Sequence, residues 1–309
     1  MSSNAHVPVL LGPVLEGLNI KANGCYVDGT FGRGGHSKAI LDQLTANGRL
    51  IAIDRDPQAI ASAPQALLSD PRFELIRGEC AQLEKFIAER GLLGSVDGVL
   101  LDLGVSSPQL DEAGRGFSFL RDGPLDMRMD PDAGISAADW LARVDEKELK
   151  RVLKTYGEER SAARIARAIV SARDEAPIRR TGQLAKIIAD AAPSHGDRIH
   201  PATRSFQAIR IVINDELEQL RAVLEQSVNV LRRGGRLCVI SFHSLEDRLV
   251  KRFIRESSRE SEQYRGMPSV PAEFRPKLKA VGKLIEATAA EVEANRRARS
   301  ARLRVAERL

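Results

Sequence analysis

The sequence VDGTFGRGGH at residues 27–36 decides the fold of this chain. An apolar lead at 24–27 predicts a strand that ends at Asp28, and apolar positions at helical spacing follow the stretch over 37–44. A strand, a glycine-rich turn and a helix open the nucleotide-binding unit of many α/β proteins. The glycines let a ligand approach the backbone closely and supply positive φ angles where the turn needs them.

Three further apolar stretches, at 48–54, 73–78 and 96–104, predict the next strands of a right-handed parallel sheet. The last of them is nearly continuous, which is typical of a parallel strand covered on both faces. Ligands bind such sheets at the carboxyl ends of the strands. We therefore expect one edge of the sheet to carry the polar residues that end or follow these strands, namely Asp28, Asp54, Cys80 and Asp102.

The composition is that of an ordinary globular protein. The chain has 309 residues, enough for one large domain or two smaller ones, and 43% of them are hydrophobic. No apolar run reaches about 18 residues, so no membrane helix is expected, and no signal peptide is visible. The three cysteines are far apart, which predicts a reducing cytoplasm and no disulfide framework. The net charge of +5 leans modestly toward an anionic partner.

The acids of the first two strands indicate the kind of ligand. Asp54 lies about 20 residues beyond the glycine turn, where a nucleotide-binding unit places a carboxylate for ribose hydroxyls. Helix capping is the alternative for Asp54 and the favoured interpretation for Asp56. An acid at Asp28 would repel a nearby pyrophosphate but suit a ligand with an amine and a sulfonium. The sequence therefore favours S-adenosylmethionine over NAD.

The acceptor chemistry follows from what the chain lacks. Methylation of a pyrimidine at carbon 5 needs an activated cysteine. Cys25 and Cys238 lie in expected strands without an adjacent base, and Cys80 has no neighbouring His or Lys. Methyl transfer to nitrogen needs only groups that orient the amine and take its proton. Asp102, Ser107 and the Pro108 carbonyl are groups of that kind, with ordinary turn chemistry as the alternative for Ser107 and Pro108.

The five histidines share no spacing typical of metal ligands, so no metal site is expected. His36 begins the helix after the glycines and is the one expected near a ligand, whereas His195 and His200 are expected in a loop. Residues 243–247 resemble a catalytic cluster, but acids in the first turn of a helix are the favoured interpretation.

The strand pattern stops between residues 111 and 204, which predicts an all-helical insertion. Its helices are expected at 137–141, 146–156, 161–174 and 181–191, with N-caps at Asp145 and Thr181. The flanking parts, 1–110 and 205–309, would form the sheet domain. After the insertion, helices are expected at 205–231 and 243–256, and strands at 237–242, near 278–281 and near 301–305.

Basic residues cluster late in the chain. Four of them lie on one expected helix, Arg248, Lys251, Arg252 and Arg255, and six arginines crowd the last 15 residues, from Arg296 to Arg308. These charges predict either a solvated face or a surface for RNA phosphates. Four aromatic side chains could stack a splayed base, with packing an equal alternative for the last: Trp140, Phe117, Phe119 and Phe206.

Taken together, several stretches resemble the bacterial small-subunit (16S) ribosomal RNA cytosine-N4 methyltransferases, the RsmH or MraW family. The resemblance runs nearly end to end. It rests on residues 28–36, 54–57, 101–109, 116–130, 199–204, 241–247 and 297–308.

The resemblance implies a class I (Rossmann-like) methyltransferase sheet with a helical insertion for substrate recognition. It also implies S-adenosylmethionine as donor and a decoding-region cytidine as acceptor, in free RNA or an assembled small subunit. Family cofactor contacts map onto Gly34, Gly35, His36, Asp54, Cys80, Asp102 and Gln109. An aromatic residue is expected at position 80, so Cys80 is a departure that weakens stacking on adenine. Asp102 and Ser107 are the candidate catalytic residues.

Two alternatives stay open. A DNA amine methyltransferase has a similar motif order but usually carries a second proline and an aromatic residue where Gln109 follows Pro108 here. A ribosome-assembly factor would bind RNA and use the cofactor site only structurally. The expected location is the cytoplasm, no membrane partner is expected, and a homodimer is left open.

Overall fold

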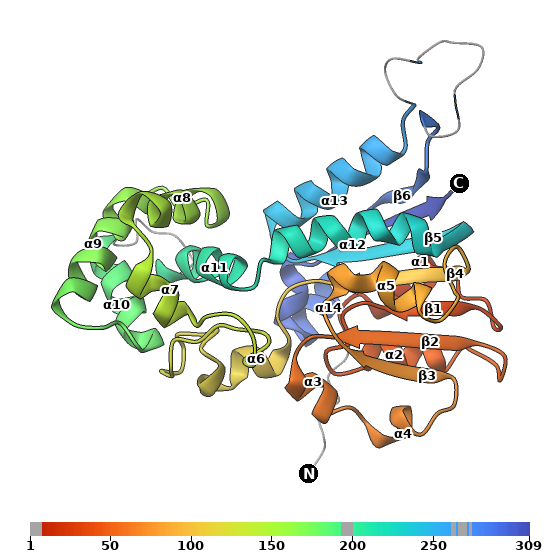
Figure 1. The fold of residues 1–309 in the computed structure, drawn as a ribbon, viewed down its shortest axis with the longest axis horizontal. Coiled ribbons are helices and arrows are strands. Elements are labelled where there is room, and N and C mark those ends of the chain that lie inside the picture. Colours follow the sequence, from red (N-terminus) through yellow and green to blue (C-terminus); the bar gives the residue numbers. More distant parts are fainter. Residues whose placement is uncertain (1–7, 193–199, 261–263, 265–270, 272–273) are drawn as a thin grey trace. The chain divides into compact units, whose positions relative to one another are not determined.

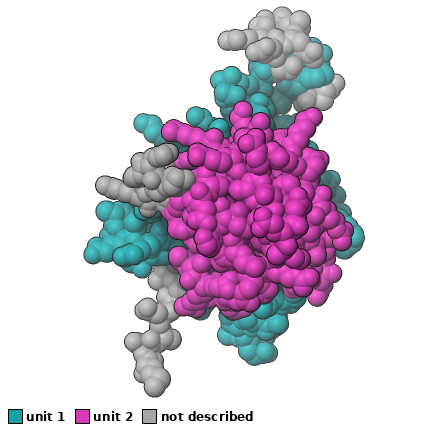
Figure 2. Space-filling model, turned by 90° about the vertical axis from the view of Figure 1, so that its left-hand side faces the viewer, with its two compact units in different colours: residues 1–104, 218–309 teal, residues 105–217 magenta. Residues whose placement is uncertain are grey.

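The computed structural model describes residues 8–192, 200–260, 264, 271 and 274–309 (Figure 1). The chain divides into two compact units, one of residues 1–104 and 218–309 and the other of residues 105–217 (Figure 2). No helix in the described ranges is long and apolar enough to cross a membrane.

The first unit is built on a seven-stranded sheet with the order β3-β2-β1-β4-β5-β7-β6. The strands are β1 (Cys25–Asp28), β2 (Arg49–Asp54), β3 (Phe73–Arg77), β4 (Val96–Asp102), β5 (Leu231–Ser241), β6 (Leu278–Glu286) and β7 (Arg302–Arg308). Strands β1 to β5 pair in parallel, and β7 is antiparallel to both β5 and β6. The predicted Rossmann-like sheet is confirmed. Its strand order reverses between β1 and β4, which is where such sheets bind ligands.

Helices cover both faces of this sheet (Figure 1). They are α1 (Leu11–Leu18), α2 (Gly35–Leu41), α3 (Pro57–Ala61), α4 (Gln65–Leu68), α5 (Leu83–Ala88), α12 (Glu216–Val230), α13 (Ser244–Ser257) and α14 (Ala289–Ala294), with short 3-10 turns η1 (Cys80–Gln82) and η5 (Arg296–Ser300). The central strands are apolar on both faces, and Val27, Ile51 and Leu101 are fully buried. A two-faced apolar core of this kind explains the continuous hydrophobic runs of the sequence.

The second unit is helical, as expected. Its elements are α6 (Ser107–Asp111), η2 (Ala113–Arg115), α7 (Ala137–Arg143), α8 (Glu146–Tyr156), α9 (Ala162–Glu175), α10 (Thr181–Ala191) and α11 (Ala202–Ile213). One buried apolar cluster joins the longer helices, with Leu149, Ile165 and Leu184 at its centre. Helix α11 adds Phe206 and Ile209 to this cluster. The unit therefore ends at residue 217, beyond the boundary at 204 that the sequence indicated.

Three local predictions are wrong. The single helix expected at 205–231 is two helices, because Asp215 between them adopts a left-handed backbone conformation with φ 51°. Thr181 is not an N-cap: Arg180 holds that position, and the Thr181 hydroxyl accepts a hydrogen bond from Gly123 N at 3.0 Å. The strand expected to begin at residue 237 begins at Leu231, so the arginines and glycines of 232–236 belong to β5. The other predicted N-cap, Asp145, is confirmed.

Candidate functional site

Three carboxylates end the adjacent strands β2, β1 and β4 of the first unit: Asp54, Asp28 and Asp102. Their strands are parallel, so the three residues share the carboxyl edge of the sheet at its switch point. Burial raises the pKa of both Asp54 and Asp102, and the nearby charge of Asp28 raises both further. The predicted gathering of acids is therefore confirmed.

Asp28 stabilises the glycine-rich turn through hydrogen bonds. Its side chain is buried, and its two oxygens accept hydrogen bonds from Thr30 N at 3.1 Å and from the Ser37 hydroxyl at 2.7 Å. Burial raises its pKa, while these donors partly oppose the shift. The sequence suggested that this acid would suit a cationic ligand. In the structure both oxygens of its carboxylate accept hydrogen bonds from the turn and from α2. Asp28 therefore influences the site through its negative charge, which raises the pKa of Asp54 and Asp102.

Asp54 is held against the same turn. Its Oδ2 accepts from Gly32 N at 2.7 Å and its Oδ1 from Asp56 N at 2.9 Å. Burial raises the pKa of Asp54 to about 6 despite these two bonds. Each carboxylate oxygen can accept a further hydrogen bond, so the side chain remains able to receive ribose hydroxyls. Asp56 caps α3 by accepting from Gln58 N at 2.9 Å, which confirms the capping interpretation for that residue.

Asp102 carries the feature that distinguishes this edge. Its backbone N–H donates to the Thr30 hydroxyl at 2.6 Å, which ties the end of β4 to the glycine-rich turn. Its carboxylate oxygen Oδ1 is buried and has no hydrogen-bond partner among the described residues. Burial raises the pKa of Asp102 to about 6; Asp28 and Glu246 add to the shift and His36 opposes it. An unpaired buried acceptor of this kind calls for an N–H or O–H donor.

His36 lies beside the other oxygen of Asp102. Its Nε2 is 3.0 Å from the Val9 carbonyl oxygen, and its Nδ1 is 3.5 Å from Asp102 Oδ2. A carbonyl only accepts, so Nε2 carries a proton. The structure thus brings the His36 ring and the Asp102 carboxylate together at the edge of the sheet.

Gly34 and Gly35 are set by the geometry of the turn. Gly34 has φ 72°, and a Cβ atom there would lie 2.7 Å from the Phe31 ring. A Cβ atom on Gly35 would lie 2.5 Å from Pro8. Packing alone therefore requires glycine at both positions. Their contact with a cofactor, which the resemblance implied, stays a prediction.

Cys80 reaches the same edge at the start of η1. A Cβ atom built on Gly29 would lie 3.9 Å from Cys80 Cβ, so the thiol packs beside the turn after β1. Burial raises the pKa of Cys80 and of Cys25 to about 11, and it raises the pKa of Cys238 as well. All three cysteines are therefore thiols at neutral pH. None is prepared as the nucleophile that carbon-5 methylation needs.

Ser107 and Gln109 belong to the second unit, at the start of α6. Gln109 is buried, and its Oε1 accepts from Ser106 N at 2.9 Å as part of a capping box. This contact shapes the turn after the β4 motif. The predicted roles of Gln109 with the cofactor and of Ser107 in catalysis stay predictions.

The aromatic candidates of the second unit differ in exposure. Phe117 and Phe206 are buried, which confirms packing for Phe206. Phe119 is half-buried, with its ring centroid 4.9 Å from that of Phe206 and 4.6 Å from that of His200. Trp140 is also half-buried. Phe119 and Trp140 thus remain candidates for stacking on a base. Of the two histidines expected in a loop, His195 lies outside the described residues.

The segment at 243–247 starts α13, as favoured from the sequence. Glu246 Oε2 accepts from Phe242 N at 2.8 Å at the first turn of this helix. Asp247 is buried and accepts from Arg304 Nε at 2.7 Å and from Arg302 at 3.3 Å. Part of the arginine cluster at the end of the chain is therefore structural, because these two side chains hold β7 against α13.

Sequence reasoning missed Thr30, which links Asp28 to Asp102. A hydroxyl two residues after an acid at the end of a strand is a signal that could have found it, because such a side chain can bond locally or across the turn. It also missed Ser37, whose hydroxyl shares the task of holding Asp28.

A family model described as the MraW methylase family matches residues 3–309. Among solved structures, the chain is similar to an rRNA methylase from Streptococcus thermophilus, with 12% identity, a TM-score of 0.44 and 99% of each chain covered. It is also similar to TrmN from Thermus thermophilus, with 12% identity, a TM-score of 0.43 and coverage of 97% of this chain and 48% of that one. The family match spans almost the whole chain.

Proposed function

Because the chain belongs to the MraW methylase family, we propose that its acceptor is a cytidine in the decoding region of small-subunit (16S) ribosomal RNA. The family is that of the ribosomal RNA cytosine-N4 methyltransferases, and the chain is an S-adenosylmethionine-dependent RNA methyltransferase. The observation that carries the assignment of the site is the buried Asp102 Oδ1 without a partner in the described chain.

The residues of the sheet edge fit S-adenosylmethionine. Asp54 retains acceptor capacity for the ribose hydroxyls, and the acids Asp28 and Asp102 favour a positively charged ligand. When bound, this cofactor supplies a methyl group attached to a positively charged sulfur. Cys80 offers a thiol where an aromatic ring would stack on adenine, so that contact is the weakest of the set.

Asp102 is placed to handle the acceptor amine. The N4 nitrogen of cytosine shares its lone pair with the ring, so it becomes a nucleophile only when its N–H groups are oriented and a proton can leave. The Asp102 carboxylate would accept one N4–H and so orient the nitrogen. It would also take the proton that the amine loses when the methyl group passes from the sulfonium sulfur to the nitrogen. A pKa of about 6 suits this task, because the group is mostly ionised at neutral pH and still a useful base.

His36 would assist Asp102, because its ring nitrogen Nδ1 lies 3.5 Å from the second carboxylate oxygen and helps to keep the side chain in one orientation. Ser107, a catalytic candidate from the sequence, keeps that role in this proposal. The three protonated cysteines support a direct transfer, without a covalent adduct on the base.

The test is methylation of small-subunit ribosomal RNA by the purified protein. Subunits and protein-free RNA from a strain that lacks the enzyme are incubated with methyl-labelled cofactor, then digested and analysed by mass spectrometry. We expect N4-methylcytidine in one oligonucleotide of the decoding region. Label confined to DNA would favour the DNA methyltransferase alternative, and no label on any nucleic acid would favour the assembly factor.

The partner and the location also belong to this proposal. We infer that the enzyme acts on the small subunit or its RNA in the cytoplasm, and the three free cysteines support a reducing compartment. Comparing the two substrates in the same assay decides between naked RNA and an assembled subunit. Sedimentation of the purified protein over a range of concentrations decides whether it forms a homodimer.

A further inference from the structure

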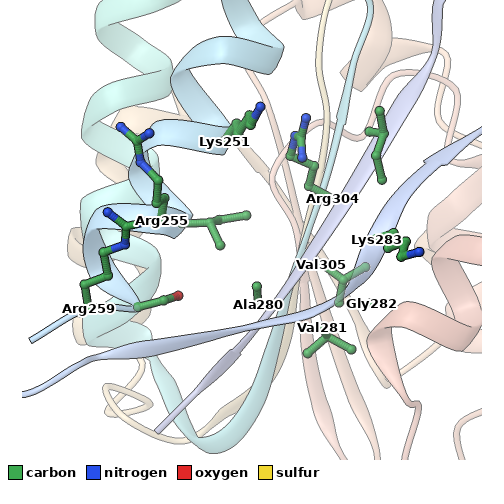
Figure 3. Close-up of a pocket in the computed structure, with 12 residues that line it drawn as sticks. Lys251, Arg255, Arg259, Ala280, Val281, Gly282, Lys283, Arg304 and Val305 are labelled. Atoms are coloured by element: carbon green, nitrogen blue, oxygen red, sulfur yellow. The ribbon is translucent and has the colours of Figure 1, made fainter.

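A groove opens on the first unit between α13 and β6, with one wall completed by β7 (Figure 3). Its volume is about 380 Å³. Strand β6 is the outermost strand of the sheet, and β7 and β5 separate it from β4 and β1. The groove is therefore distinct from the carboxyl edge that carries Asp54, Asp28 and Asp102.

The rim of the groove is cationic. Lys251 and Arg255 of α13 line one side with Arg259, which follows just after the helix, and Lys283 of β6 lies across the groove from them (Figure 3). All four side chains are exposed, and none has an ion-pair partner in the part of the chain that the structure describes. Among the described residues that line the groove none is acidic, although α13 carries Glu256 nearby.

The floor of the groove is different in kind. Ile254, Val281 and Val305 make it apolar, and Arg304 enters it from β7. Unlike the four cations of the rim, Arg304 forms an ion pair within the described chain, with Asp247 of the same unit. An apolar floor with an unpaired cationic rim fits a strand that carries regular negative charges on one side and flat apolar faces on the other.

The spacing of the rim agrees with such a ligand. Residues four apart on a helix are separated by about 6 Å along its axis, so Lys251 and Arg255 match the spacing of successive phosphates. Arg259, just after the helix, adds a third cation to the same rim. Long, exposed, unpaired side chains can adjust to a phosphate without breaking an internal contact. An RNA backbone satisfies both the charge and the shape of the groove.

We propose that this groove binds the phosphodiester backbone of the RNA substrate, away from the nucleotide that is methylated. This inference rests on the proposed function, because ribosomal RNA is the polyanion that the enzyme must hold. The groove supplies affinity and orientation, whereas the sheet edge supplies chemistry.

The experiment compares two triple variants with equal loss of charge. The groove variant is Lys251→Gln, Arg255→Gln and Arg259→Gln; the control is Lys85→Gln, Arg221→Gln and Arg233→Gln, at exposed positions of the same unit outside the groove. Affinity for small-subunit RNA is measured over a series of salt concentrations, and methylation kinetics and cofactor affinity are measured alongside. Thermal unfolding of both variants checks that they fold.

The groove variant should bind RNA roughly 10- to 50-fold more weakly near physiological salt, and its salt slope should fall by about 2. Its KM for RNA should rise far more than kcat changes, and its affinity for the cofactor should match that of the wild type. The control should lose less than about threefold in RNA affinity.

Equal RNA affinity and equal salt slope for the two variants would overturn the inference. A defect on assembled subunits but not on free RNA would also overturn it, because the groove would then contact a ribosomal protein. The proposed function fails separately, if the wild type forms no N4-methylcytidine. A groove variant that still loses affinity for RNA in that case would keep the groove as an RNA site.

Discussion

Asp102→Asn should make the protein more stable at neutral pH and remove nearly all of its activity. The two effects have one cause: the carboxylate of Asp102 is buried, and burial disfavours its charged form. Its pKa rises from 3.8 to about 6 through burial, and one of its oxygens has no partner in the described chain. An asparagine of the same shape removes the charge and keeps the size of the side chain.

The magnitude follows from the pKa shift. Between about pH 4 and pH 6 the folded protein holds a proton on Asp102 that the unfolded chain has already lost. The free energy of unfolding therefore falls as the pH rises through this window, by about 3 kcal/mol in total for this group. The side chain is 26% exposed, so we expect the lower part of a range of about 1–3 kcal/mol. Asp102→Asn should gain this amount at pH 7.5 and nothing at pH 4 or below.

The activity should change in the opposite sense. The asparagine oxygen can still accept the N4–H, but it cannot take the proton, so kcat should fall by about 10²- to 10⁴-fold. In the wild type, kcat should rise with pH up to about 6 and then level off, and at pH 5 it should be about a tenth of the plateau. The variant should lack this acidic limb.

Urea unfolding at pH 4, 5.5 and 7.5 measures the stability, and methylation at saturating cofactor and RNA between pH 5 and 8 measures the activity. Asp54 has a similarly raised pKa, so it adds to the pH dependence of the unfolding free energy in both the wild type and the variant. Its contribution cancels when the two free energies are subtracted. A variant that is less stable than the wild type at pH 7.5 would refute the electrostatic reasoning. Unchanged kcat with the acidic limb still present would show that another group takes the proton.

Three further predictions concern the rest of the edge. Asp54→Ala should weaken cofactor binding by about 1–3 kcal/mol, because the ribose hydroxyls lose their acceptor; unchanged affinity by calorimetry would remove Asp54 from the site. Thr30→Val leaves the Asp102 N–H without its acceptor and should cost about 1–3 kcal/mol of unfolding free energy, whereas Thr30→Ser should not; equal stability of the two variants in urea would contradict this tie between β1 and β4. Cys80→Phe should tighten cofactor binding by about 0.5–1.5 kcal/mol through stacking on adenine, and weaker binding by a variant with normal thermal unfolding would place the adenine elsewhere.

The sheet and its acids could be predicted from the sequence for a physical reason. Strands covered on both faces need nearly continuous apolar runs, and a carboxylate directly after such a run has few places to lie except at the strand's end. Asp54 and Asp102 follow this rule, and parallel pairing brings them to one edge. The orientation of each carboxylate depends on backbone donors such as Gly32 N, and these become visible only in the folded turn.

Other features depend on contacts that periodicity does not encode. The break at Asp215 is a single residue in a left-handed conformation, and apolar positions continue at helical spacing on both sides of it. The arginines of the last strand form a charge run in the sequence, but their partner Asp247 lies 57 residues before Arg304. The basic residues Lys251 and Arg255 were visible in the sequence, yet only the structure separates them from the arginines that already pair with acids.

The arrangement of the three acids explains why stability and function oppose each other at this edge. Burial disfavours the charge of each carboxylate, and the negative charge of Asp28 raises the pKa of both Asp54 and Asp102. Donors from the turn stabilise Asp28 and Asp54, but one oxygen of Asp102 lacks a donor from the described chain. A protein that needed only the sheet would gain stability from a neutral residue there. An acid at that position is useful when a positively charged donor lies beside it and an amine must lose a proton, and the methyl transfer supplies both conditions.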